Sequence, residues 1–435
     1  MQFFAQKFKG WANVADVFFS LCGDEPNAFW LDREHHPSAK FSVVGSGELE
    51  RFDSIELLSD RIAELAALWP QTDVPGSLPF DFRPGLVGSI DYEAADLRFI
   101  LAERAIVFDH SARGMYFLGW FDSESDFKHW HHAAMLRLAL IGGQEAAYRH
   151  RSRATGSVST ATVRLSDEHY LSNIDEARRL IAVGDVYQIC LTNRLSFNHD
   201  LDAALVFLQL RALNPAPYSS FMRLGEVSLV CASPEQFLTV SSAGELSSKP
   251  IKGTRSRSDN AAEDDAAAAE LRTSHKERAE NLMIVDLMRN DLARVSEPES
   301  VTVSKLFAVE SYATVHQLVS TITSQLRADQ SAADALSSAF PGGSMTGAPK
   351  LRAMTHIARL EGGLRGHYSG VNGFISAQGT ADFGMTIRSI VFEPGKGYIG
   401  VGGGITIDSV SQDELAEVKL KARASLQALG TDCAW

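Results

Sequence analysis

The chain has 435 residues, of which 45% are hydrophobic and 22% charged, a balance typical of soluble globular proteins with one large or two ordinary domains. Its formal net charge of −13 argues against nucleic acid or an anionic membrane as the main partner, because both favour a basic protein surface. The four cysteines form no CxxC pair, the amino terminus has no signal-peptide pattern, and no uncharged apolar run is long enough to span a membrane. We therefore expect a cytoplasmic protein.

Short, alternating and aromatic-rich apolar runs predict strands in the first 143 residues, with a helix at 54–69. The strands are expected at 28–33, 41–47, 86–93, 105–110 and 114–121. Gly142-Gly143 and the polar stretch ending at 153–162 predict a linker. The sequence is therefore divided into an amino-terminal domain over 1–150 and a second domain over 151–435.

The second domain is expected to open with a helix whose start is signalled at Ser166. Further helices are predicted at 259–295, from Val315 onward, after the loop that begins at 341, and at 413–429. Strands are predicted at 186–197, 219–225, 227–240, 245–253, 300–312, 368–376, 381–393 and 397–408. The many hairpin-like strands predict a mixed α/β (α+β) fold with antiparallel sheets rather than a parallel doubly wound sheet.

The most informative segment is the octapeptide PIKGTRSR at 250–257. Its Lys252 lies between a β-like run and a Gly-Thr turn, and a partly desolvated lysine can lose its proton near neutral pH and act as a nucleophile. Arg255 and Arg257 would lower the pKa of that lysine and could hold a carboxylated substrate. Taken alone, the octapeptide also fits a solvated turn after a strand.

Two predicted helices each carry a pair of glutamates three residues apart, which places each pair on one helix face. The pairs are Glu277 with Glu280 and Glu414 with Glu417, and Lys421 follows Glu417 by four residues. Two such helices facing one site would supply the oxygen ligands that Mg2+ prefers. Solvated helix surfaces carry the same pattern, so the spacing leaves both interpretations open.

Other candidate residues lie near strand ends or in glycine-rich turns. The backbone amides of 402–404 could hold an anion, although a bulge is an equal alternative. Arg388 needs a partner on its β-like run, and a substrate carboxylate is one candidate. Glu235 ends a predicted strand, and His316 is either a proton donor or a core histidine. The loop at 341–350 fails the GxxxxGK[ST] pattern, which excludes a P-loop.

In this order, these segments resemble the chorismate-utilising enzymes, the family of anthranilate synthase component I, aminodeoxychorismate synthase component I and the isochorismate and salicylate synthases. The matching stretches are 184–194, 232–238, 250–257, 277–295, 314–322, 340–354, 368–376, 387–392, 402–409 and 414–424. The resemblance implies the chorismate-binding enzyme fold, with two antiparallel β-sheets packed face to face, helices outside, and the site in the carboxy-terminal module.

Two positions separate the branches of this family. The water-adding synthases carry a lysine where this chain has Gln188, and anthranilate synthases usually carry alanine where it has Lys252. Lysine at that position marks the aminodeoxychorismate synthases, so the resemblance implies amination of chorismate to 4-amino-4-deoxychorismate for p-aminobenzoate and folate synthesis. Anthranilate synthase component I, or another 2-amino-chorismate former, is the nearest alternative. A non-catalytic chorismate-binding docking subunit is the alternative of a different class.

The resemblance also implies a role for each matching residue. Lys252 would attack C2 of chorismate, Glu235 would act as the acid/base at the 4-hydroxyl, and His316 would lie near the leaving group. The substrate-binding residues would be Thr254, Arg388, Gly402, Gly403, Gly404 and Lys421. Mg2+ would bind Glu280 and Glu417, with Glu277 and Glu414 as supporting carboxylates.

The partners implied are chorismate, ammonia and a separate glutamine amidotransferase subunit, because no cysteine of this sequence lies in a GxCxG-like glutaminase elbow. The family's tryptophan-binding Leu-Leu-Glu-Ser segment appears here as Trp30-Leu31-Asp32-Arg33, so feedback inhibition by tryptophan is not expected. Gln236, Ser256 and Gly403 also depart from the usual family residues.

Overall fold

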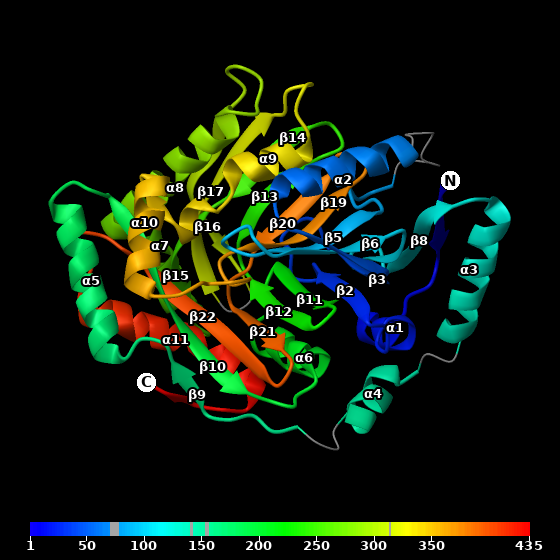
Figure 1. Cartoon of the computed structure of the whole chain (residues 1–435), viewed down its shortest axis with the longest axis horizontal. Helices are drawn as coiled ribbons and strands as arrows, with labels where there is room; N and C mark the ends of the chain where they lie inside the picture. Colours follow the sequence, from blue (N-terminus) through cyan, green and yellow to red (C-terminus); the bar gives the residue numbers. More distant parts are fainter. Residues whose placement is uncertain (70–77, 140–141, 153–155, 313–314) are drawn as a thin grey trace.

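The computed structural model describes residues 1–69, 78–139, 142–152, 156–312 and 315–435. Two large, mainly antiparallel sheets form the body of the molecule, and helices cover their outer faces (Figure 1). Within the described ranges, no helix has both the length and the apolar character needed to cross a membrane. The predicted linker at 142–162 lies partly outside these ranges.

The larger sheet has the strand order β1 (Gln2–Phe8), β8 (Gly114–Phe121), β7 (Arg104–Asp109), β3 (Phe41–Ser46), β2 (Asn27–Asp32), β11 (Tyr218–Leu224), β12 (Val227–Ser233), β21 (Ser389–Glu393), β22 (Lys396–Ile405), β10 (Gln188–Asn198), β9 (Ala161–Val163) and β23 (Cys433–Ala434), with β18 (Gly347–Ala348) also paired to β10. The smaller sheet has the order β15 (Ile251–Ser256), β17 (Val315–Gln325), β14 (Glu245–Lys249), β13 (Gln236–Val240), β20 (Ala381–Met385), β19 (Val371–Ser376), β5 (Gly85–Ile90), β6 (Leu97–Ala102) and β4 (Glu48–Phe52), with β16 (Thr302–Ser311) also paired to β17.

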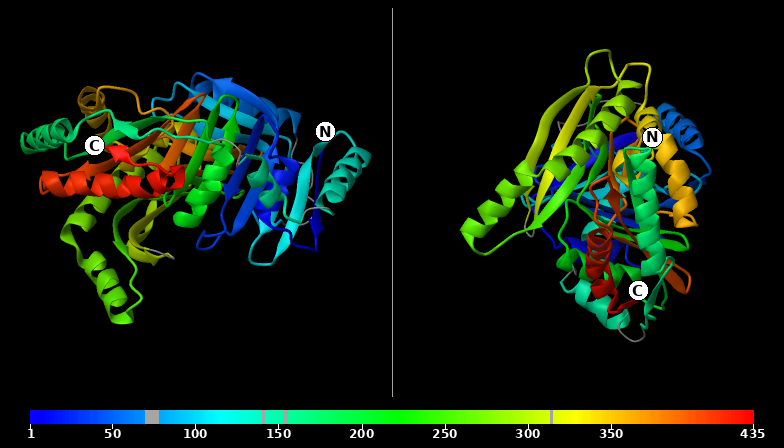
Figure 2. Two further views of the ribbon diagram at one scale, coloured as in Figure 1. Left: turned by 90° about the horizontal axis from the view of Figure 1, so that it is seen from below. Right: turned by 90° about the vertical axis from the view of Figure 1, so that its left-hand side faces the viewer.

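The helices are α1 (Val14–Leu21), α2 (Ile55–Leu68), α3 (Glu124–Leu138), α4 (Gln144–Ser152), α5 (Asp167–Ala182), α6 (Ala203–Leu213), α7 (Ala261–Thr273), α8 (His275–Ala293), α9 (Ala332–Ala339), α10 (Lys350–Glu361) and α11 (Ser411–Leu429). A 3-10 turn, η1, spans Gly343–Met345. Figure 2 shows α7 projecting from the body. Ser166 caps α5 by accepting a hydrogen bond from the backbone N–H of His169, which confirms the predicted start signal.

Strand alternation explains the two cores of the molecule. In β2, Phe29 and Leu31 face the core shared by the two sheets, whereas Ala28 and Trp30 face a second core under the helices of the larger sheet. The first core also packs against α2, α8 and α9, and the second lies beneath α1, α5, α6, α10 and α11. The larger sheet is therefore buried on both faces, which matches the predicted arrangement of two packed sheets with outer helices.

Both sheets join strands from both sides of the predicted boundary at 150/151. In the larger sheet β2 pairs with β11, and in the smaller sheet β5 pairs with β19. The boundary at 150/151 therefore remains a prediction from the sequence, and the two parts of the chain share both sheets.

The helix predicted from Val315 is wrong, because this segment is the strand β17. Its sequence VHQLVSTITSQ is rich in β-branched residues, which favour strands, and it pairs with β14, β15 and β16.

Candidate active site

Four elements bring predicted site residues together: β15 from the smaller sheet, β10 and β22 from the larger sheet, and α8. The closest approach is at Gly404 of β22. A Cβ atom at this glycine would lie 2.5 Å from Gln188 Nε2, 3.2 Å from Lys252 Nζ and 3.3 Å from Glu280 Oε2. Only a residue without a side chain leaves these three groups their shared space.

Lys252 reaches this point because β15 is irregular at the next residue. The register with β17 shifts between Lys252 and Thr254, and Gly253 has φ +76°. A Cβ at Gly253 would lie 2.8 Å from Glu277 Oε2, so the bulge needs glycine for both its conformation and its space. Within the described part of the chain, the Lys252 ammonium has no hydrogen-bond or ion-pair partner. It is therefore available to a ligand.

Glu235 lies between β12 and β13 and is 6% exposed. Burial raises the pKa of its carboxyl to about 7, against the opposing effects of the Ser344 hydroxyl, the Lys252 charge and the Ile251 backbone N–H. A carboxyl with this pKa is present in both protonation states near neutral pH. It can therefore both donate and accept a proton.

Glu280, on α8, has a raised carboxyl pKa like that of Glu235. Burial raises the pKa of its carboxyl to about 7, and Lys252 and Lys276 oppose this effect. Lys276 Nζ lies 2.9 Å from Glu414 Oε1, so this lysine joins the glutamate pairs of α8 and α11. Glu277 and Glu414 act on Glu280 in the opposite sense and raise its pKa.

Glu417 and Lys421 form the other side of this group on α11. Their side chains are 2.7 Å apart, and Lys421 Nζ also donates to the Gly402 carbonyl at 2.8 Å. Burial opposes ionisation of Glu417, but the charge and hydrogen bond of Lys421 lower its carboxyl pKa overall. Two lysines thus neutralise two of the four predicted metal ligands.

The four glutamates are not arranged as a preformed metal-binding site. Among the residues that the structure describes, no three His, Cys, Asp or Glu side chains are grouped closely enough to hold a metal ion. Their chemistry nevertheless fits a hard cation, since all four offer carboxylate oxygens around the same pair of helices.

Arg388 is the other cation of the site without a partner. Its backbone has φ +52°, and its guanidinium forms no hydrogen bond or ion pair with any described residue. Burial lowers its pKa, while the nearby Tyr368 hydroxyl and Glu417 carboxylate raise it. A non-glycine residue in this backbone region is uncommon, and such strain is characteristic of functional sites.

His316 and Thr254 make contacts of their own outside this group. His316 is buried, with Nε2 2.9 Å from Asp264 Oδ1 and Nδ1 2.7 Å from Ser311 Oγ. Thr254 is exposed, and its hydroxyl lies 3.5 Å from Gln317 Nε2. Among the described residues, neither side chain forms a hydrogen bond or ion pair with Glu235 or Glu280.

The prediction that Arg255 and Arg257 could hold a substrate carboxylate does not match their contacts. Arg255 pairs with Glu270 at 2.6 Å and with Glu277 at 3.4 Å, and Arg257 pairs with Asp264 at 2.8 Å. Both guanidinium groups are therefore committed to carboxylates of α7 and α8 rather than to a substrate.

Three contributors were missed by the sequence analysis as functional residues. Ser344 contacts the Glu235 carboxyl, Tyr368 lies beside Arg388, and Lys276 joins the two glutamate pairs. All three lie within or next to segments that carried the family resemblance, which was the only available signal.

Comparison with known proteins gives a consistent result. The family model described as chorismate binding enzyme matches residues 24–427. The chain is 39% identical to an aminodeoxychorismate synthase of Streptomyces griseus, over 97% of this chain and 63% of that protein. It is 37% identical to aminodeoxychorismate synthase component 1 of Escherichia coli, over 96% of both chains, and 34% identical to anthranilate synthase component 1 of Streptomyces coelicolor, over 95% of this chain and 86% of that one.

Solved structures agree on the fold. Anthranilate synthase component I from Streptococcus pneumoniae superposes with a TM-score of 0.73 at 26% identity, covering 98% of this chain and 92% of that chain. The menaquinone-specific isochorismate synthase of Escherichia coli gives a TM-score of 0.75 at 17% identity, over 98% and 94% of the two chains, which is a likeness of fold alone. The chain thus spans less than two thirds of the Streptomyces griseus relative but nearly the full length of several others.

Proposed function

This chain belongs to the family of chorismate binding enzymes, and from that premise and the geometry of the site we propose that it is component I of an aminodeoxychorismate synthase. It would convert chorismate and ammonia to 4-amino-4-deoxychorismate. One observation carries the proposal: the unpaired amine of Lys252 lies with Glu280 and Gln188 around Gly404, and its charge acts on the buried Glu235. The named relatives that carry this activity support it.

In the proposed reaction, the neutral amine of Lys252 forms a bond to C2 of chorismate as the C4–O bond breaks. Glu235, in its protonated form, gives its proton to the departing hydroxyl, which leaves as water. Ammonia then forms a bond to C4, the C2–N bond breaks, and the Glu235 carboxylate takes up the proton that ammonia releases. A carboxyl with a pKa of about 7 suits both roles.

The substrate carboxylates would bind to cations and backbone amides around this point. Arg388 has an unsatisfied guanidinium for one of them. After Ile399, β22 is paired with β10 on one side and is no longer paired with β21 on the other. Every second backbone amide of Gly402–Gly404 therefore has no partner strand among the described residues. These amides and Lys421 would complete the carboxylate site.

Mg2+ is the cofactor we propose for this site. Glu280 and Glu417 would hold it, with Glu277 and Glu414 beside them, because these carboxylates offer only hard oxygen ligands. The ion, when bound, would neutralise the ring carboxylate as a Lewis acid. The lysines now paired with Glu414 and Glu417 would have to release these carboxylates.

Ammonia in the cell would come from a separate glutamine amidotransferase subunit. The four cysteines are free thiols, three of them buried, which fits a reducing cytoplasm. Thr254 and His316 remain predicted members of the site.

The test is an assay of the purified chain with chorismate, ammonium and Mg2+, with the products identified by mass spectrometry. 4-Amino-4-deoxychorismate keeps its enolpyruvyl group, whereas anthranilate does not, so an anthranilate synthase would give a product of different mass. A 2-amino isomer has the same mass as 4-amino-4-deoxychorismate and is distinguished by its fragmentation pattern. Absence of any turnover would instead support a docking subunit.

The role of Lys252 is tested by Lys252→Ala. Its loss as the nucleophile should lower kcat by orders of magnitude while chorismate still binds, whereas loss of a carboxylate contact would mainly raise KM. Lys249→Ala is the matched control, because Lys249 ends β14 close to Lys252 in the sequence and pairs with Glu310 of β16. Protein quenched with chorismate but without ammonia should carry an adduct on the peptide that contains Lys252. Near-normal kcat in Lys252→Ala would refute the assignment.

A further inference from the structure

The turn between β5 and β6 holds the chain just before Tyr368 in place. The Glu93 carboxylate accepts hydrogen bonds from the backbone N–H groups of Arg365 and Gly366, at 2.8 and 3.0 Å. The Tyr92 backbone N–H donates to the Gly366 carbonyl at 2.8 Å. Backbone groups of the carboxy-terminal module are thus fixed by a turn of the amino-terminal module.

His367 is buried and is oriented by two side chains of the same amino-terminal region. The single hydroxyl proton of Ser89 is donated to the Val371 carbonyl at 3.0 Å, so its oxygen accepts from His367 Nδ1–H at 3.1 Å. On the other side of the ring, His367 Nε2 faces the Asp96 carboxylate at 3.5 Å. His367 is the main influence that lowers the pKa of Asp96, against the effect of burial, and Arg98 adds to it.

Tyr368 follows directly and links this segment to the proposed substrate cation. Its ring packs on Gly400 of β22, where a Cβ atom would overlap it, and its hydroxyl acts on the charge of Arg388. The Ser369 backbone N–H donates to the Thr386 carbonyl at 2.9 Å, two residues before Arg388. Ser369 and Arg388 have φ of +70° and +52°, a backbone region that non-glycine residues occupy only where their surroundings hold them.

We propose that His367 is a positioning residue for a chorismate carboxylate and acts through Tyr368 and Arg388. The inference rests on the proposed function, because it takes Arg388 as the cation that binds this carboxylate. A strained arginine keeps its guanidinium in one place only if the chain beside it is fixed, and Ser89 and Asp96 supply that restraint through the imidazole ring. The amino-terminal module therefore contributes to substrate affinity, although no residue of it is assigned to chorismate above.

The test is His367→Ala, which removes both contacts of the ring. KM for chorismate, and its Kd measured by calorimetry without ammonia, should each rise by about tenfold. The kcat should stay within about threefold of wild type, because a binding contact that is equal in the ground state and the transition state changes KM alone.

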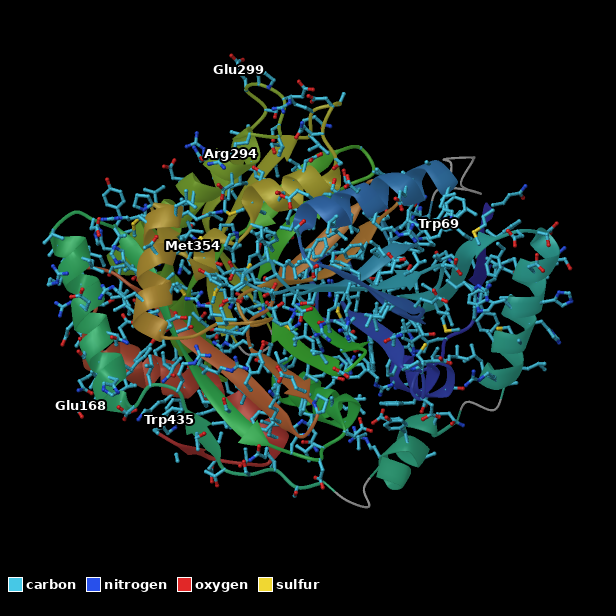
Figure 3. All side chains as sticks on the ribbon, in the orientation of Figure 1. Trp69, Glu168, Arg294, Glu299, Met354 and Trp435 are labelled. Atoms are coloured by element: carbon cyan, nitrogen blue, oxygen red, sulfur yellow. The ribbon has the colours of Figure 1, made fainter. Side chains whose placement is uncertain are left out.

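The matched control is His356→Ala, which removes a histidine–aspartate pair elsewhere in the molecule. His356 lies on α10, two residues after the Met354 that Figure 3 labels, and its Nε2 lies 2.7 Å from Asp185. This variant should lower the thermal midpoint of unfolding but leave KM and Kd for chorismate within about twofold of wild type.

A double-mutant cycle separates positioning from general stability. Because His367 would act through Arg388, adding His367→Ala to Arg388→Met should change KM for chorismate by less than about twofold. Asp96→Asn is a milder second variant that keeps the shape of the side chain and guards against a failure of His367→Ala to fold. It should raise the Kd for chorismate by about threefold or more.

A wild-type Kd for chorismate in Asp96→Asn would overturn the inference, and so would a further tenfold rise in KM when His367→Ala is added to Arg388→Met. A wild-type chain that binds chorismate but forms no aminated product would instead overturn the proposed function. Since Kd is measured without ammonia, the two failures are distinguishable.

Discussion

The burial of Glu235 predicts that the proposed acid/base residue weakens the fold at alkaline pH. Its carboxyl has an ordinary pKa of 4.5, which burial raises to about 7 in the native chain. Between these values the native chain holds a proton that the unfolded chain has released, so the free energy of unfolding falls as pH rises. Over about 2.5 pH units, at about 1.4 kcal/mol each, the loss is ~3 kcal/mol above pH 7.

Glu235→Gln removes this ionisation but keeps the shape of the side chain. The free energy of unfolding, measured by urea denaturation, should match wild type near pH 4.5 and exceed it by about 3 kcal/mol at pH 8.5. At the same time kcat should fall by about 10²–10⁴, because the proton donor and acceptor is lost. The variant is thus expected to be more stable and less active.

The control is Glu226→Gln, which changes an exposed glutamate in the turn between β11 and β12. It should leave the free energy of unfolding within about 0.5 kcal/mol of wild type at both pH values. A Glu235→Gln chain whose stability relative to wild type is the same at pH 4.5 and 8.5 would refute the reasoning, whatever its activity.

Three further predictions concern metal, substrate and nitrogen source. Glu280→Gln and Glu417→Gln should each weaken Mg2+ binding in calorimetric titration and abolish turnover, because each removes a charged oxygen ligand; full turnover in EDTA would contradict this. Arg388→Met should raise KM for chorismate by about 10- to 150-fold, the equivalent of roughly 1.5–3 kcal/mol for a charged hydrogen bond, and an unchanged KM would remove Arg388 from the substrate site. The purified chain should use ammonium but not glutamine, because burial raises the thiol pKa of Cys190 and Cys231; glutamine-dependent product would disprove this.

Much of the fold could be predicted because local patterns and tertiary structure agree. The strands at 28–33 and 114–121 and the helix at 54–69 appear at nearly the predicted positions as β2, β8 and α2. The segment from Val315 failed because a strand in the middle of a sheet is decided by its neighbours. Those neighbours, β14 and β16, lie far from one another in the sequence.

In the candidate site, too, features within one short segment could be predicted, whereas contacts between distant segments could not. The glutamate spacing on α8 and α11 and the lysine of β15 could be read from the sequence. The partners of Arg255 and Arg257 could not, because Glu270 and Asp264 approach only after α7 folds back onto β15. The position of Lys276 among the glutamates could not be predicted either, since its partner Glu414 is 138 residues away.

Lys252, Glu235 and Glu280 depend on one another electrostatically, which affects how any kinetic result is interpreted. The charge of Lys252 opposes the effect of burial on both carboxyls, so it holds each pKa lower than burial alone would set it. Lys252→Ala should therefore raise the pKa of Glu235 and Glu280 as well as remove the amine. Part of the lost kcat at neutral pH would then come from an acid/base residue that no longer ionises and from a metal ligand that stays protonated. A pH–rate profile of this variant should show its ionisation displaced to higher pH. The rate alone cannot separate the two causes, so the covalent adduct on Lys252 is the observation that decides whether this lysine is the nucleophile.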